Sequence, residues 1–546
     1  MKQSFFNRIL HAVAPNYLAK RQLAQVQSDF LALYGQNSGT GYGNHGAGYN
    51  TSTMGWGAYS TNADSDLIVN RDTLVQRSRD LFMGSALPNG VLKDIAQNVS
   101  GGGLTLKSSI NYKYLGISNE EAKNLEEKIE FEFDLWANKS YCCDLEASSS
   151  FYDMQTLAML SVLLSGDVFI VMPIKERKNS VYDLKLKIIE ADRVMDPNNK
   201  DPNKNILGGI ELDDDGAPIA YYLVNQLPYA QNYGKIQPTE WKRIPAFGAK
   251  SGRRNILHLF TAERPGQRRG IPILSPVVEM FKQLTRYSEA EIMSAIVASS
   301  FSVFIKKINP TQATFDQVSQ NAVQRMSGNV GQQTQVPSNY ANYRIEPGLV
   351  MEMNPNESIE IANPTRTNTG YGEFVDSILK QVAVGLGLPQ EYMLKNMTSS
   401  YSASRAAIML AWEMFLTRRK WLVREFCQPI YEEWLSEAVA KGRVNLPGFF
   451  DSLSTKAAWS RTNWIGTNPI QIDPVKEAEA AKIRIDECLT TREHEAMQLG
   501  SGSFDEILPV RKIEEEGMDE VRRTEKPIFT GTVRSDAVIG NKKDER

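Results

Sequence analysis

Apolar residues recur at helical spacing in the first part of the chain, and short alternating runs follow them. From Asp64 to Asn98 apolar side chains return every three or four residues, until the run Gly101–Gly103 ends the pattern. Further elements follow in order: helices over 119–136 and 154–165, and strands over 168–172, 184–189, 219–223 and 256–260. This succession of helices and strands predicts an α+β domain over residues 63–272.

Residues 273–305 differ in kind, because they contain no glycine and no proline after Pro276. Apolar residues keep helical spacing here, so the pattern predicts one helix of about 33 residues, roughly 50 Å long. The helical pattern is lost over 306–364, where two short strands are predicted, over 343–352 and 358–361.

Helical periodicity returns at 373–386 and breaks at Gly387-Leu388-Pro389. After a polar stretch a second long helical segment starts at Ser404, and Pro429 inside it predicts a kink. More helix is predicted over 473–526, and the residues from 527 to 546 lack periodicity and are expected to form an exposed tail.

Composition fits a protein that buries more than one core. The chain has 546 residues, of which 42% are hydrophobic and 23% are charged. Lys and Arg number 61 against 64 Asp and Glu, so the net charge of −3 provides no global basic field for binding nucleic acid. Residues 35–62 are rich in Gly, Asn and Tyr, a composition typical of a linker. The most apolar run, 292–305, is shorter than the roughly 18–20 residues of a membrane-spanning helix, so we expect no membrane span.

The residue pattern predicts no catalytic centre, no metal site and no cofactor. The four histidines stand singly, at His11, His45, His258 and His494. None has the spacing to a second ligand that a zinc site requires, and His258 is predicted to be a hydrogen-bonded residue of a strand. No G-x-S-x-G sequence is present that could supply a hydrolase nucleophile.

Two short segments resemble ligand-binding motifs but favour plain turns. In Gly248-Ala249-Lys250-Ser251, alanine stands where a phosphate-binding loop needs glycine before its lysine. Asp213-Asp214-Asp215 could hold a hard cation, but the following Gly216 favours a solvated hairpin turn. The basic segment 264–269 leaves two interpretations open, contact with phosphates or pairing with acidic residues at a subunit contact.

The order of several motifs is similar to that of the lambda-like family of tailed-phage portal proteins, over roughly Asp72 to Val521. The most specific motif residues are Arg264, Pro265, Gly266, Gln267, Arg269 and Gly270, and later Tyr401, Ser402, Ser404 and Arg405. Between these two groups stand the long helix and the Gly387-Leu388-Pro389 break.

The resemblance implies an α+β portal-type fold in a set order of parts. These are an N-terminal arm and linker (1–62), a wing (63–272), a first stem helix (273–305), a clip (306–364), a second stem helix (365–389), a tunnel loop (390–403), a long wing helix (404–472), a helical crown (473–526) and a tail (527–546).

The resemblance further implies a ring, usually of twelve subunits, that forms the pore at one capsid vertex. Double-stranded DNA would pass through it non-specifically during packaging and ejection. The implied partners are the terminase large subunit, the head-tail adaptor, and the major capsid and scaffold proteins. The implied location is the virion, after assembly in the host cytoplasm, and no enzymatic activity is expected.

Within the tunnel loop, a polar group of residues is the candidate channel lining: Lys395, Asn396, Met397, Thr398, Ser399 and Ser400. Short polar side chains make weak, exchangeable contacts with passing phosphates, whereas many strong cationic contacts around a ring would arrest the DNA. A plain connection between two helices is the alternative for this segment. For the whole chain, the alternatives are a minor capsid or other connector subunit and, less favoured, a packaging nuclease or ATPase.

Overall fold

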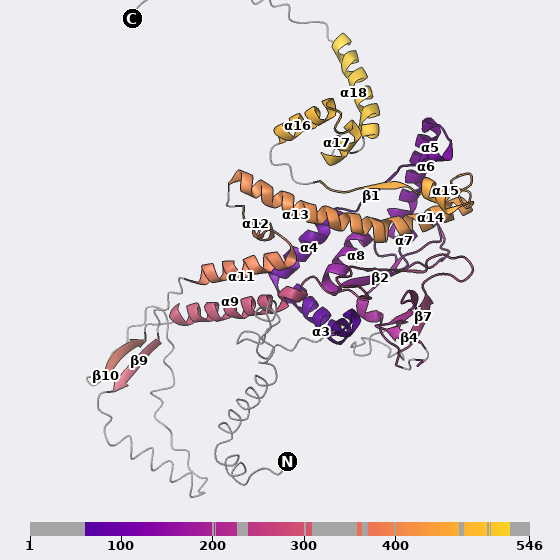
Figure 1. Cartoon of the computed structure of the whole chain (residues 1–546). Helices are drawn as coiled ribbons and strands as arrows, with labels where there is room; N and C mark the ends of the chain where they lie inside the picture. The colour runs from indigo at the N-terminus through magenta and orange to yellow at the C-terminus, as the bar shows by residue number, and fades with distance from the viewer. Residues whose placement is uncertain are drawn as a thin grey trace, which may run out of the picture. The chain divides into compact units, whose positions relative to one another are not determined.

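The computed structural model describes residues 61–198, 201–202, 204–225, 239–299, 302–307, 357–362, 370–397, 400–468, 474–499, 502 and 504–524. The chain divides into two units, Met1–Asp66 and Leu67–Arg546. Only residues 61–66 of the first unit are described, and the account below concerns the second (Figure 1). The predicted tail, the strand over 343–352 and the linker up to residue 60 lie outside the described residues.

The first half of the α+β body is mainly helical. Its helices are α3 (Ala63–Gly84), α4 (Ala86–Ser100), α6 (Asn119–Ala137) and α8 (Phe151–Ser165), with single turns at α5 (Tyr112–Leu115) and α7 (Ser140–Cys143). In α6 the hydroxyl of Ser118 accepts from the backbone of Glu121, whose carboxylate accepts from the backbone of Ser118, which is a capping box. The predicted helices over 119–136 and 154–165 are confirmed, and the helical stretch over 64–98 is broken at Ser85.

Two antiparallel sheets complete this body. One has the order β3-β2-β8, and the other is the meander β4-β5-β6-β7. Their strands are β2 (Asp167–Val171), β3 (Lys187–Ile189), β4 (Asn205–Leu207), β5 (Ile210–Leu212), β6 (Pro218–Val224), β7 (Trp241–Pro245) and β8 (Ile256–Phe260). The strands predicted over 168–172, 219–223 and 256–260 are confirmed. Of the strand predicted over 184–189, only the last three residues are regular, while Leu184 and Leu186 form isolated bridges.

The predicted helix over 273–305 is wrong at both ends. A short 3₁₀ turn, Ser275–Val277, comes first, and α9 then spans Val278–Ser299. Proline disfavours the α conformation in the residue before it, so Pro276 delays the start of the regular helix. At the other end β9 (Ser302–Lys307) pairs antiparallel with β10 (Glu357–Ala362). Residues 302–307 form a strand because they pair with β10, about fifty positions later in the chain. The helical spacing within this segment cannot reveal such a distant partner. Strand β10 confirms the strand predicted over 358–361.

The second helical part begins with α11 (Tyr371–Leu386), as predicted. After the single turn α12 (Gln390–Met393), helix α13 runs over Tyr401–Leu422 and α14 over Gln428–Ala440. The two are joined by one π-helical turn, Val423–Cys427, placed directly before Pro429. Pro429 has no backbone N–H to donate to the preceding turn, and the wider π turn accommodates this within one continuous helical segment. Where a kink was predicted, the structure has a π turn.

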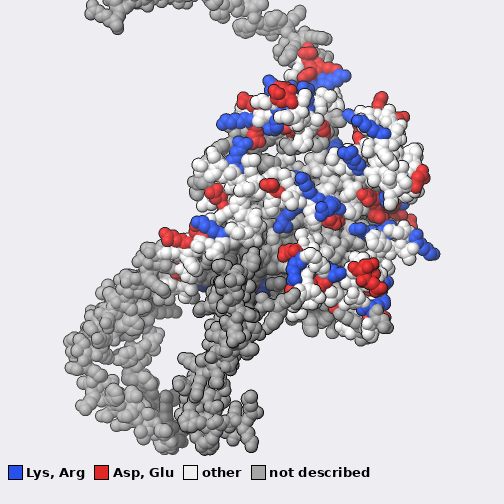
Figure 2. Space-filling view, viewed as in Figure 1, with Lys and Arg blue, Asp and Glu red and all other residues white. Residues whose placement is uncertain are grey.

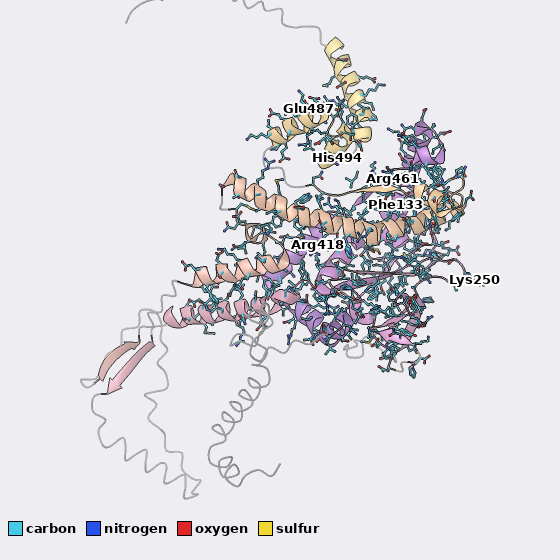
Figure 3. The ribbon with its side chains drawn as sticks, in the orientation of Figure 1. Phe133, Lys250, Arg418, Arg461, Glu487 and His494 are labelled. Atoms are coloured by element: carbon cyan, nitrogen blue, oxygen red, sulfur yellow. The ribbon has the colours of Figure 1, made fainter. Side chains whose placement is uncertain are left out.

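The C-terminal helices share one core with the N-terminal ones. Phe133 of α6, labelled in Figure 3, lies in this core. Its ring lies edge-on to Trp434 of α14, with 5.0 Å between the ring centres, and to Phe151 of α8 at 5.5 Å. Strand β11 (Thr462–Ile465), which follows α15 (Leu453–Trp459), pairs with β1 (Thr105–Ser108). Segments more than three hundred residues apart are therefore packed into one body.

Three further helices, α16 (Pro474–Asp486), α17 (Arg492–Gln498) and α18 (Phe504–Thr524), follow this core. They match the helical region predicted over 473–526. Among the described residues, no helix is both long enough and apolar enough to cross a membrane.

Candidate functional site: the buried arginine cluster and the connection between α11 and α13

The side chain of Gln267 holds the basic turn over residues 264–269, before α9, with three hydrogen bonds to the backbone. Gln267 is buried, and its side-chain oxygen accepts hydrogen bonds from the backbone N–H groups of Glu263 and Arg264, at 2.9 and 3.2 Å. Its side-chain nitrogen donates to the carbonyl of Arg269 at 2.8 Å. Gly266 has φ +80°, a conformation that glycine adopts without strain. Arg264, Pro265 and Gly266 are exposed, whereas the second half of the motif is buried.

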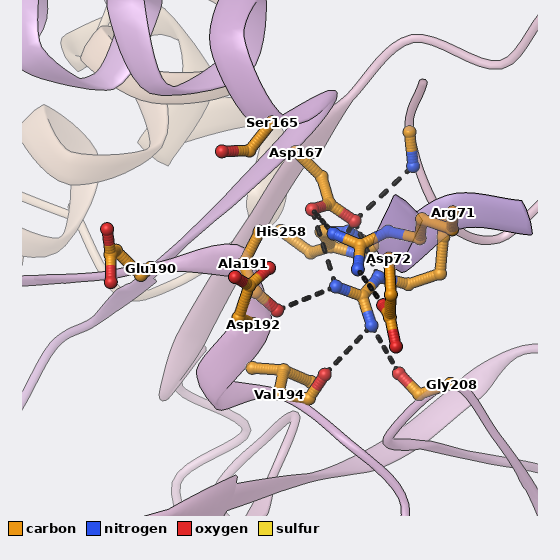
Figure 4. Close-up of polar contacts among 12 residues, drawn as sticks. Arg71, Asp72, Ser165, Asp167, Glu190, Ala191, Asp192, Val194, Gly208 and His258 are labelled. Atoms are coloured by element: carbon orange, nitrogen blue, oxygen red, sulfur yellow. Dashed lines mark hydrogen bonds and ion pairs between the residues drawn. The ribbon is translucent and has the colours of Figure 1, made fainter. Parts of the chain in front are cut away.

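Arg269 enters a buried cluster with Asp167 at the start of β2 (Figure 4). Its Nε lies 2.5 Å from one carboxylate oxygen, and Nη2 of Arg71 on α3 lies 2.8 Å from the other. Arg269 also donates to the carbonyls of Ala191, Val194 and Gly208, so its remaining N–H groups are bonded as well. Because Arg269 is only 2% exposed and bonded on every side, phosphate contact is excluded for it. The acidic partner lies within the same chain, not at a subunit contact.

The charge states in this cluster follow from burial and pairing. Burial alone would raise the pKa of Asp167, but the two arginines hold it far below its ordinary value. His258 of β8 lies 3.4 Å from Asp167 and stacks on Phe169, with ring centres 4.2 Å apart. Its burial lowers the histidine pKa although the carboxylate opposes this shift. The prediction that His258 is a hydrogen-bonded strand residue is confirmed.

Two glycines let the segment before α9 touch the strand that carries Asp167. A Cβ on Gly270 would lie 1.9 Å from the carbonyl oxygen of Gly166, and one on Gly166 would lie 2.4 Å from the carbonyl carbon of Gly270. Neither distance is possible for a real side chain. The backbone contact and the arginine cluster together fix where the chain leaves the body toward α9.

Helices α9 and α11 lie side by side (Figure 1). Tyr287 of α9 stacks on Tyr371 of α11 with ring centres 5.5 Å apart, and Phe374 lies 4.8 Å from Tyr287. Near the other end, Gly385 leaves room for Val277, since a Cβ there would meet the valine side chain at 2.6 Å. The contacts at both ends keep the two helices together along their length.

The connection from α11 to α13 is held by a few anchors. Gly387 ends α11 in the left-handed conformation, with φ 70°. Leu388 and Met393 are buried, while Lys395 has φ 54° and forms a bond of 2.9 Å from its Nζ to Asp94 on α4. The cation expected near DNA is therefore paired, although its side chain is 71% exposed.

The other candidate channel residues lie between Lys395 and the start of α13. Asn396 and Met397 are exposed, and Thr398 and Ser399 lie outside the described residues. Ser400 is the N-cap of α13, and its hydroxyl accepts from the backbone of Ala403. Tyr401, Ser402 and Ser404 form the first turn of α13, and Arg405 pairs with Glu477 of α16 at 3.5 Å. The two groups of motif residues are not brought together: the first joins the cluster at Asp167, and the second begins α13.

Sequence reasoning missed two arginines of α13. Arg419 donates to the carbonyls of Val99 and Asn98, at 2.8 and 2.9 Å, and thereby caps the C-terminal end of α4. Arg418 is partly buried, and burial lowers its pKa. Its Nε donates to the sulfur of Met414, at 3.1 Å. The sequence pattern did not reveal their burial, because arginines on the solvated face of a helix occur at the same spacing.

The segments that resemble ligand-binding motifs are turns in the structure. The loop at Lys250 connects β7 to β8, where Gly248 and Arg253 are hydrogen-bonded across it, and no helix follows (Figure 3). Asp213 accepts from the backbone N–H groups of Asp215 and Ala217 in the hairpin between β5 and β6. No cluster of histidine, cysteine and carboxylate ligands for a metal occurs among the described residues.

The described part of the chain is an α+β body with α9 and α11 packed side by side and an anchored polar connection from α11 to α13. The sequence model described as phage portal protein, lambda family, matches residues 49–419. The chain therefore belongs to this family. The match begins inside the glycine-rich stretch, earlier than the predicted Asp72, and it ends before the predicted Val521.

Two relatives are similar over most of their length. The chain is 26% identical to Portal protein B of Escherichia phage lambda over 470 residues, which cover 84% of this chain and 86% of the relative. It is also 26% identical to the Portal protein of Escherichia phage N15 over 469 residues, 84% of this chain and 87% of the relative. Among solved structures, a chain of the virion of a native gene transfer agent particle covers 79% of this chain and 93% of its own, at a TM-score of 0.42 and 11% identity.

Proposed function

We propose that copies of this chain assemble into the ring-shaped pore at one capsid vertex through which viral DNA is packaged and ejected. The observation that carries this proposal is the family match over residues 49–419, supported by two portal proteins aligned over 84% of the chain. A ring of twelve copies is the arrangement we expect. The location is the virion, and assembly takes place in the host cytoplasm.

The connection from α11 to α13 lines the constriction of this pore in the proposal. Its exposed side chains are short or uncharged at Asn396, Met397 and Ser400, and Lys395 is paired with Asp94. Duplex DNA carries about one phosphate per 1.7 Å of axis, and a ring of unpaired lysines would hold it by counterion release. A paired lysine beside neutral residues favours sliding. The exposed face in Figure 2 likewise has Lys and Arg interspersed with Asp and Glu.

Docking is the second part of the proposed role. The ring would offer its outer surface to the terminase large subunit, the head-tail adaptor, and the major capsid and scaffold proteins. The proposed role is structural, with no catalysis by this chain. Measuring ATP turnover and Mg²⁺-dependent DNA cleavage by the purified protein tests this, and activity abolished by a point substitution would contradict it.

Negative-stain imaging of the purified protein tests the ring itself. We expect closed rings with a central pore, and solid particles or a stable monomer at all concentrations would overturn the proposal. A sharper test replaces Thr398 with tryptophan. Rings should still form, but DNA packaging in an assembly reaction should fall, because a bulky side chain narrows the constriction. Glu176→Trp, at an exposed position outside this connection, should package normally. Loss of rings with Thr398→Trp would instead make the segment a packing element.

A further inference from the structure

A groove of about 580 Å³ lies between α8 and α13. Met159 and Val162 of α8 contribute one wall, and Leu410, Met414, Arg418 and Trp421 of α13 contribute the other. The α13 residues are spaced by four, four and three positions, so they form one stripe along a single face of the helix. Leu410 is 62% exposed, and its neighbour Met409 is exposed to the same extent. Glu413 and Thr417 of α13 and Thr261 line the groove as well, so its lining is mixed, with Leu410 as an apolar side chain that the described part of the chain leaves largely uncovered.

Arg418 is the exceptional member of this groove (Figure 3). The buried arginines have strong acceptors: Arg71 and Arg269 share Asp167, and Arg419 bonds to carbonyl oxygens. Arg418 is partly buried, and it donates to the sulfur of Met414, a weak acceptor. Within the described ranges no carboxylate pairs with it. A guanidinium held in this groove is expected to have an anion opposite it in the assembled state, because an unpaired desolvated charge is costly.

We propose that this groove receives a neighbouring copy of the chain, which places an apolar side chain on Leu410 and Met414 and a carboxylate against Arg418. The inference rests on the proposed ring, in which every subunit must bury two different flanks against its neighbours. The chain's own surface carries the required combination. On α6, for example, Phe131 is 63% exposed and Glu127 is exposed one helical turn before it.

Duplex DNA fits the same groove poorly. Its phosphates remain hydrated and are bound by exposed cations, whereas the α8 wall of the groove, Met159 and Val162, has no hydrogen-bond donor for a phosphate. A carboxylate on a protein side chain can enter together with an apolar neighbour, and the guanidinium plane then pairs with it in two-pronged geometry. The groove chemistry therefore favours a protein over a nucleic acid.

Charge reversal tests the proposal. Arg418→Glu should raise the concentration at which half of the protein is assembled into rings by at least about tenfold, as measured by mass photometry over a dilution series. Arg418→Lys keeps the charge and should have a smaller effect. Lys420→Glu, on an exposed position of the same helix, is the matched control and should assemble as the wild type does. Assembly of Arg418→Glu at wild-type concentrations would overturn the proposal.

Thermal unfolding of the monomer, measured below the concentration at which rings form, distinguishes a misfolded Arg418→Glu variant from one that only fails to assemble. Wild-type and Arg418→Glu monomers should unfold at the same temperature. If the monomer is destabilised as much as the ring, another segment of the same chain occupies the groove and the proposal is wrong.

Cross-linking identifies the occupant directly. A photoreactive benzoyl-phenylalanine at Thr417, an exposed residue that lines the groove, should yield dimers and larger species on a denaturing gel. Adducts with DNA, or cross-links within one chain alone, would overturn the proposal. If the wild-type protein forms no rings at all, the proposed function fails and this inference fails with it. If both wild type and Arg418→Glu form rings equally, only this inference fails.

Discussion

Replacing Asp167 with asparagine should destabilise the protein far more than removing an exposed ion pair from the same arginine. The carboxylate is fully buried and accepts from Arg269 at 2.5 Å, from Arg71 at 2.8 Å and from the backbone of Gly270 at 3.3 Å. Asparagine keeps the volume but leaves buried Arg269 without its carboxylate partner and Arg71 with only the exposed Asp72. Breaking a buried pair in this way costs about 3–5 kcal/mol.

Asp72 provides the matched control, because it also pairs with Arg71, at 3.5 Å, while its own side chain is 77% exposed. Asp72→Asn should lower the free energy of unfolding by at most about 1 kcal/mol. Urea titrations followed by circular dichroism and tryptophan fluorescence measure both variants under the same conditions. If the two variants differ by less than about 1 kcal/mol, the cluster does not hold the segment before α9 in place, and the reasoning fails.

Two other substitutions test neighbouring features of the same region. The lowered pKa of buried His258 means that, below its ordinary value of 6.5, the unfolded chain binds a proton that the folded chain does not. Stability should therefore fall on acidification below about pH 6.5, and His258→Phe should reduce that slope in pH-dependent urea midpoints, whereas the exposed His494→Phe should not. Gly270→Ala should cost about 3 kcal/mol or more, since no space exists for the methyl group. Gly102→Ala, with open space around it, should change the urea midpoint little, and equal effects of the two alanines would refute the close backbone contact.

Elements encoded by local patterns could be predicted from the sequence. The capping box at Ser118 and Glu121 starts α6 where the pattern changes, and the hairpin turn at Asp213 is closed by its own side chain. Strand β9 could not be predicted in this way, because Val303-Phe304-Ile305 continues a helical pattern and becomes a strand only by pairing with β10. Non-local pairing overrides local propensity in such a segment.

In the candidate site, too, local motifs could be predicted from the sequence, whereas contacts between distant residues could not. Arg269 was identified as a motif residue, but its partner Asp167 lies 102 positions earlier, and no spacing rule connects them. For this reason, phosphate contact and acidic pairing could not be separated from the sequence. The partial burial of Arg418 was likewise invisible, because the wall opposite α13 comes from α8, more than two hundred residues earlier. Family resemblance located the connection from α11 to α13, whereas the anchor at Asp94 required the fold.

The central claim, a ring whose constriction is formed by residues 395–400, is tested most directly by a single-particle reconstruction of the assembled protein. We expect a closed ring with α9 and α11 beside the central channel and this connection nearest to the axis in every copy. An assembly without a channel, or a ring that carries residues 395–400 on its outer rim, would contradict it.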